Sequence, residues 1–67
     1  MILALIFDNH EGGETSRETT KKTWRRDAES LELSGDRIDS LCLVGVGGQS
    51  VILTGDQVRA AIYGGAA

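Results

Sequence analysis

The stretch "IDSLCLVGVGGQSVILT", residues 38–54, decides how this chain folds. Residues 38–46 carry apolar side chains on both parities of a strand: Ile38, Cys42, Val44 and Val46 on one, Leu41 and Leu43 on the other. Such a strand belongs in the middle of a sheet, or has one face in a subunit interface. Two glycines, Gly47 and Gly48, can supply the positive φ angles of a tight turn. The stretch therefore predicts strands over 38–46 and 49–54, joined by a hairpin.

A helix is predicted directly after this hairpin, over residues 55–63. Thr54 and Gln57 have the spacing of a capping box, in which each side chain bonds the other residue's backbone amide. The apolar stripe of this helix comprises Val58, Ala61 and Ile62. A helix of about two turns is not stable alone, so we expect it to pack on the sheet.

Turn signals divide the N-terminal half of the chain. "ILALIFD", residues 2–8, is a short apolar run whose length suits a strand buried on both faces. Residues 9–14, "NHEGGE", have the composition of a loop. Within residues 30–34, Leu31 and Leu33 alternate with polar residues, which predicts a half-buried strand.

Residues 15–26 allow two interpretations. As a helix, they would use a capping box from Thr15 to Glu18 and would share an apolar face with Ala28 and Leu31. As a strand, they would use their threonines and Trp24, because β-branched and aromatic residues suit a half-exposed sheet surface and are poor helix formers. We favour a strand over residues 18–26.

Together these elements predict an α+β fold in one small domain spanning residues 1–67. The expected architecture is a small antiparallel β-meander of four to five strands, with one short C-terminal helix packed on the sheet. The sequence shows no internal repeat and no linker.

A chain of 67 residues builds a core that is only marginally stabilising. An internal disulfide is excluded, because Cys42 is the only cysteine. A structural zinc site needs about four ligands, and Cys42 and His10 are each alone of their kind. We therefore expect no metal and no cofactor, and we expect a homo-oligomer, first of all a dimer, to supply the missing stability.

Hydropathy and cysteine content suggest where the protein works. No apolar run approaches the ~20 residues of a membrane span, so we expect no membrane partner. The start "MILALIF" lacks the basic region and the cleavage site of a signal peptide. With one cysteine and no targeting signal, a cytoplasmic location is expected.

Charged residues occur in blocks along the chain. The net charge is −3, but residues 17–26 sum to +4 and residues 27–39 sum to −4. The densest cluster is "KKTWRR", residues 21–26, which we name the basic segment. Its candidate partner-binding residues are Lys21, Lys22, Trp24, Arg25 and Arg26.

Three interpretations of the basic segment stay open. It can be neutralised by the acidic block, if residues 18–26 and 30–34 pair as a hairpin. It can bind single-stranded nucleic acid, combining phosphate attraction with base stacking on Trp24. It can also dock another protein, or pair with the acidic block of a second copy around a two-fold axis. The acidic net charge disfavours nucleic acid.

No pattern in the sequence indicates catalysis. Asp8, His10, Glu11 and Glu14 form a polar cluster in the first loop, but no nucleophile or second histidine completes a site there. Cys42 lies in an apolar strand, whereas a reactive thiol needs an electropositive, partly exposed setting. "GVGGQS", residues 45–50, leads into a strand, whereas a phosphate-binding loop leads into a helix.

The sequence therefore predicts a small non-catalytic interaction protein that binds another macromolecule, most plausibly a protein. Free-standing acidic domains without chemistry are typical of accessory or inhibitor proteins of phages and mobile elements. The alternative is a sheet-based single-stranded nucleic-acid-binding protein that uses residues 21–26.

Overall fold

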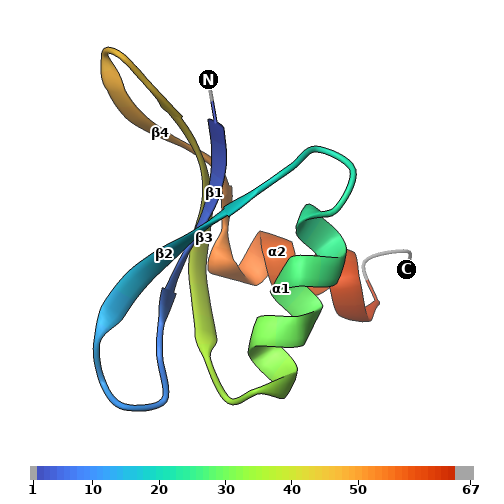
Figure 1. Cartoon of the computed structure of the whole chain (residues 1–67). Helices are drawn as coiled ribbons and strands as arrows, with labels where there is room; N and C mark the ends of the chain where they lie inside the picture. The colour runs from blue at the N-terminus through green and yellow to red at the C-terminus, as the bar shows by residue number, and fades with distance from the viewer. Residues whose placement is uncertain (1, 65–67) are drawn as a thin grey trace.

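The structure is a computed structural model that describes residues 2–64. Its elements are β1 (Ile2–Asp8), β2 (Glu14–Thr19), α1 (Trp24–Leu33), β3 (Arg37–Gly45), β4 (Gly48–Thr54) and α2 (Gly55–Tyr63). The four strands form one antiparallel sheet in the order β2-β1-β3-β4. Both helices lie on the same side of this sheet (Figure 1). The predicted α+β class, with a short C-terminal helix packed on an antiparallel sheet, is confirmed.

The strand order differs from that of a simple meander. β3 pairs with β1, because α1 separates β2 from β3 and the chain returns to the middle of the sheet. The chain thus runs through a ββα unit twice, and the two hairpins meet along β1 and β3, where Leu5 faces Leu41. No repeat is visible in the sequence, yet the strand order is symmetric about this central pair.

The core lies between the helices and one face of the sheet. It consists of Leu5, Phe7, Trp24, Ala28, Leu31, Ile38, Leu41 and Val58. Side chains alternate between the two faces of a strand, and this alternation places Leu5 and Phe7 of β1 on the same face of the sheet as Leu41 of β3. Leu53 and Ile62 are partly buried against this cluster, which fixes α2 on the sheet.

Four sequence-based elements agree with the structure to within a residue at either end: 2–8, 38–46, 49–54 and 55–63. The capping box of α2 is also confirmed. Thr54 Oγ1 accepts a hydrogen bond from the amide of Gln57 at 3.3 Å, and Gln57 Oε1 accepts one from the amide of Thr54 at 2.9 Å. Gly48 has the positive φ that the predicted turn requires, at 126°.

Two predicted strands, 18–26 and 30–34, are wrong. α1 occupies Trp24–Leu33, and β2 ends at Thr19. The buried residues of α1 are Trp24, Ala28 and Leu31, which recur at the helical spacing that the sequence also allowed. Alternation of Leu31 with Leu33 was misleading, because Leu31 is buried and Leu33 is 76% exposed.

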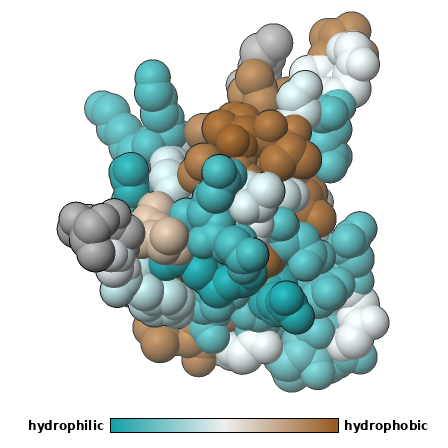
Figure 2. Space-filling view, turned by 180° about the vertical axis from the view of Figure 1, so that it is seen from behind, coloured by the Kyte–Doolittle hydropathy of each residue, from teal (hydrophilic) through white to brown (hydrophobic). Residues whose placement is uncertain are grey.

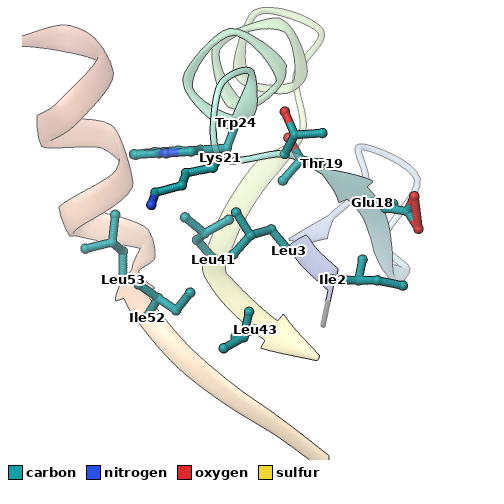
Figure 3. A pocket seen from close by; sticks show the side chains of 11 residues that line it. Ile2, Leu3, Glu18, Thr19, Lys21, Trp24, Leu41, Leu43, Ile52 and Leu53 are labelled. Atoms are coloured by element: carbon teal, nitrogen blue, oxygen red, sulfur yellow. The ribbon is translucent and has the colours of Figure 1, made fainter. Parts of the chain in front are cut away.

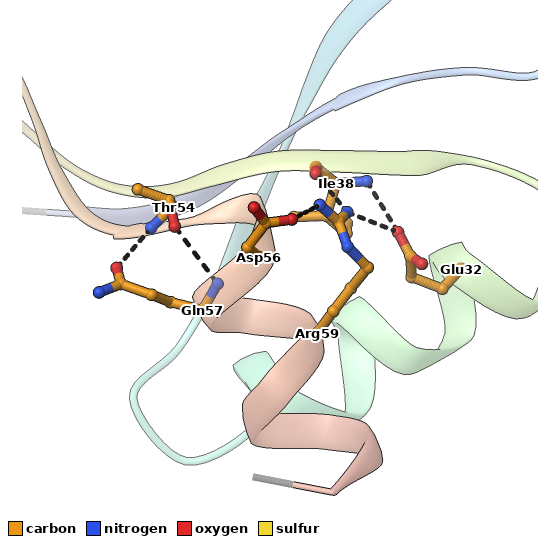
Figure 4. Close-up of polar contacts among 6 residues, drawn as sticks. All are labelled: Glu32, Ile38, Thr54, Asp56, Gln57 and Arg59. Atoms are coloured by element: carbon orange, nitrogen blue, oxygen red, sulfur yellow. Dashed lines mark hydrogen bonds and ion pairs between the residues drawn. The ribbon is translucent and has the colours of Figure 1, made fainter.

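A polar cluster ties the two helices to β3 (Figure 4). The Arg59 guanidinium of α2 donates a hydrogen bond to the carbonyl oxygen of Ile38 at 2.9 Å. The Glu32 carboxylate of α1 accepts one from the amide of Ile38 at 2.8 Å and lies 3.6 Å from Arg59. The backbone of Ile38 in β3 is thus held by side chains of both helices.

None of the helices in the described part of the chain is both long enough and apolar enough to cross a bilayer.

Candidate functional site

Threonine hydroxyls build the turn between β2 and α1. Thr20 and Thr23 hydrogen-bond through their hydroxyls at 2.7 Å, and the amide of Trp24 donates to the carbonyl of Thr20 at 2.9 Å. Thr19 Oγ1 donates to the Asp27 carboxylate, in the first turn of α1, at 2.6 Å. These local bonds compete with a sheet ladder. They explain why the threonine-rich segment ends its strand at Thr19 and enters a helix.

The basic segment lies on this turn and on the start of α1. Lys21, Lys22, Arg25 and Arg26 are exposed, and none of them forms an ion pair with any residue between 2 and 64. The predicted neutralisation across a hairpin is wrong, because residues 30–34 belong to α1 and its end rather than to a paired strand. Cations beside a helix N-terminus oppose the helix dipole and cost about 0.3–1 kcal/mol each. The stability of α1 therefore does not account for their presence.

Trp24 is largely withdrawn from solvent. Its side chain is a member of the core and is 8% exposed. The Arg25 guanidinium carbon lies 4.7 Å from the centre of the indole ring, at the distance of a cation–π contact. With one part of the ring in the core and a guanidinium over it, Trp24 offers no free platform for a nucleic-acid base.

An apolar groove of about 750 Å³ opens beside Trp24, on the side of the sheet that carries the helices. We name it the groove; the residues around it are Ile2, Leu3, Glu18, Thr19, Thr20, Lys21, Trp24, Leu41, Leu43, Ile52 and Leu53. In Figure 3, Ile2 and Glu18 point away from the hollow. The side chains around it are Leu3 of β1, Leu41 and Leu43 of β3, Ile52 and Leu53 of β4, Lys21 and the Trp24 ring. The helices thus leave one end of the sheet's apolar face uncovered.

Exposed hydrophobic residues gather near the same end of the molecule. In the view from behind, the largest continuous hydrophobic area lies in the upper half, at the height of the β3–β4 hairpin in Figure 1 (Figure 2). The exposed large apolar side chains of β1 and of this hairpin are Ile2, Val46, Val51 and Ile52. Patches of this kind on a small protein mark interaction sites.

The structure brings together only part of the predicted site. Lys21 and Trp24 border the groove and Arg25 covers the Trp24 ring, whereas Lys22 and Arg26 line no part of it. Leu3, Leu43 and Ile52 were missed. Residues 2–8 were predicted to be buried on both faces, residues 38–46 to lie in the middle of the sheet or in a subunit interface, and no face of residues 49–54 was assigned. A signal was present in residues 40–55, which contain none of the seven basic and ten acidic residues of the chain.

The other polar candidates do not assemble into a site. His10 Nδ1 lies 3.2 Å from the Asp36 carboxylate, outside the first loop, and its Nε2 lies 3.9 Å from the Glu11 carboxylate, on an exposed part of the surface. Carboxylates of Asp8, Glu14 and Asp39 lie within 4.8 Å of one another, but all three are exposed. The other candidate, Cys42, is a buried free thiol on the sheet face away from the helices, covered by Ser40 and Gln49.

No protein-family model matches the sequence, and neither the curated proteins nor the solved structures show a significant match to it.

Proposed function

We propose that this protein is a non-catalytic interaction protein that binds another protein through the groove. The observation that carries the proposal is an open apolar hollow of about 750 Å³ bordered by Lys21, in a basic segment whose four exposed cations form no ion pair with residues 2–64. We place its action in the cytoplasm, as the single free cysteine suggests. A role as an accessory or inhibitor protein is part of the same proposal.

The chemistry of the site favours a partner segment that is both apolar and acidic. Leu3, Leu41 and Leu43 offer an aliphatic floor that would take apolar anchor residues. Lys21 at the rim, and Arg25 beside it, would attract carboxylates that flank those anchors. Attraction of this kind speeds association and selects among partners. A short amphipathic segment with acidic flanks fits both features.

Nucleic acid is the less favoured partner for the basic segment. Single-strand binders stack bases on exposed aromatic rings, and each stacked base contributes about 1–3 kcal/mol. Trp24 is 8% exposed, and the remaining side chains of the groove are aliphatic or polar. Phosphate attraction alone would remain, and it gives weak binding that depends steeply on salt.

A peptide-display selection against the folded protein tests the proposal. We expect enriched peptides to combine leucine-like or aromatic anchors with aspartate or glutamate. Binding of a synthetic enriched peptide, measured by calorimetry, should be lost in Leu43→Asp and weakened at least tenfold in Lys21→Glu/Arg25→Glu.

Arg37→Glu is the matched control, because it makes the same kind of charge reversal at the opposite end of β3 from Leu43. It should bind as the wild type does. Selection of basic peptides, or no selection, would contradict the proposal. Single-stranded DNA or RNA that binds the wild type and not the Lys21→Glu/Arg25→Glu variant would favour the nucleic-acid alternative.

A further inference from the structure

β4 is an edge strand whose outer side has no neighbour among the described residues. In the order β2-β1-β3-β4 it pairs with β3 alone. Val51 and Ile52, in the middle of this edge, are 61% and 47% exposed, and Val46 at the tip of the hairpin is fully exposed. An exposed apolar edge of this kind is a template for pairing with another strand.

The two edges of the sheet differ in charge. β2, "ETSRET", carries Glu14, Arg17 and Glu18, the kind of side chains that keep an edge strand from pairing. β4, "GQSVILT", carries no charge, and the uncharged stretch extends over residues 40–55, which include most of β3. Depletion of charged residues is the compositional signature of an interface core.

We propose that β4 pairs antiparallel with β4 of a second copy of this chain, around a two-fold axis near Ser50 and Val51. Around a two-fold axis the β4 edge of one copy faces the β4 edge of the other, so a charged residue near the axis would lie close to the same charge on the second copy. An uncharged edge is free of that repulsion. The pairing would join two four-stranded sheets into one, with all helices on the same side.

The exposed apolar residues of the hairpin belong to the same interface. A stable dimer covers about 800 Å² on each copy, and the whole accessible surface of the chain is 4476 Å². Backbone pairing along one short strand does not reach that area alone, so we expect Val51 and the hairpin tip with Val46 to be covered as well. Ile52 is the extra residue of a bulge, since Cys42 pairs with Val51 and Leu41 with Leu53. Regular pairing therefore covers the part of β4 before it.

Sedimentation equilibrium over a concentration series tests the dimer. The wild type should approach twice its monomer mass of 7.1 kDa as concentration rises. Val51→Lys, which places a charge at the centre of the edge, should remain a monomer. Ser16→Lys is the matched control, since Ser16 is exposed on the same sheet face of the other edge strand, β2. It should dimerise as the wild type does.

Hydrogen exchange locates the contact. Amides of residues 49–52 should exchange more slowly at high than at low concentration, while those of β2 should not change. A wild type that stays at 7.1 kDa throughout the series would overturn the proposal. A dimer in which the amides of β2 become protected would also overturn it. The same holds if both Val51→Lys and Ser50→Lys keep native circular dichroism and still form the dimer. Leu43→Asp should leave the dimer intact, so this test and that of the groove can fail separately.

Discussion

At position 24, one indole ring lies between the core and the groove. Trp24 packs with Ala28 and Leu31 on the buried side of α1, and its remaining surface borders the groove beside Lys21. The most informative residue of the sequence is thus a structural residue that also borders the proposed binding surface. Because so little of the Trp24 ring is exposed, a packing role is favoured for this residue over base stacking.

Replacing Trp24 should therefore cost stability before it costs binding. Trp24→Ala is expected to lower the free energy of unfolding by about 3 kcal/mol or more, because it opens a cavity in a small core. Tyr63→Ala, at a ring that is 54% exposed, is the control and should change it by less than about 1 kcal/mol. Urea unfolding followed by circular dichroism measures both. Equal losses in the two variants would contradict the packing role of Trp24.

Gly55 is the second residue where local geometry decides the outcome. It joins β4 to α2, and a Cβ there would overlap the carbonyl oxygen of Ile38 and lie 3.1 Å from that of Asp39. Gly55→Ala should lower the free energy of unfolding by about 1–3 kcal/mol. Gly47→Ala, where a Cβ would meet nothing within 4 Å, should change it by no more than about 0.5 kcal/mol. Comparable urea midpoints for the two variants would show that the junction can relax.

At the scale of elements, α2 was predictable and α1 was not. The capping box of α2 and the glycine turn before β4 are local signals, because the residues that form each of them lie within a few positions of one another in the sequence. α1 instead depends on tertiary packing, because Trp24, Ala28 and Leu31 are its buried residues and the Glu32 carboxylate bonds to β3. Its threonine neighbours have strand propensity, but their hydroxyls bond to the turn and to Asp27. Local propensity therefore favoured the wrong element.

The start of α2 carries an ion pair whose effect depends on pH. Arg59 donates a hydrogen bond to Asp56 at 2.8 Å and, with its positive charge, holds the pKa of Asp56 below its ordinary value. A carboxyl whose pKa is lower in the folded state stabilises it at neutral pH, and this contribution is lost as the pH falls below about 4.

Asp56→Asn should reveal this contribution. The difference in free energy of unfolding between wild type and Asp56→Asn is expected to be constant above about pH 5 and to shrink below about pH 4. Glu29→Gln, which removes an equal charge from an exposed site on α1, is the control. Urea unfolding at a series of pH values measures both. A difference that is unchanged down to strongly acidic pH would exclude the ion pair as its source.

On the scale of the whole molecule, the residues that do not serve the core are segregated. The cations that form no ion pair with residues 2–64 lie around the start of α1, and the groove borders one of them, Lys21. The uncharged residues 40–54 of the β3–β4 hairpin lie at one end of the sheet. The sequence predicted the fold class, which is confirmed. Its choice of the basic segment as a partner-binding site stays a prediction. The sequence could not predict the groove, because that requires knowing which part of the sheet the helices leave uncovered.

Dimerisation through β4 predicts a stability that depends on concentration. A protein that folds and associates is stabilised by mass action, so its melting temperature should rise with protein concentration. Val51→Lys should abolish this rise, and Ser16→Lys should keep it. Differential scanning calorimetry at several concentrations measures the effect. A wild-type melting temperature that is independent of concentration would contradict the dimer.

The central proposal is that the groove binds acidic, apolar protein segments. The fluorescence of Trp24, which borders the groove and is the only tryptophan of the chain, can report such binding directly. Two synthetic peptides with the same leucine anchors, one flanked by glutamates and one by lysines, are titrated while the indole emission is recorded. We predict a saturable change with the glutamate peptide only, weakened by salt and absent in Leu43→Asp. A saturable change with single-stranded oligonucleotide and none with the glutamate peptide would contradict the account.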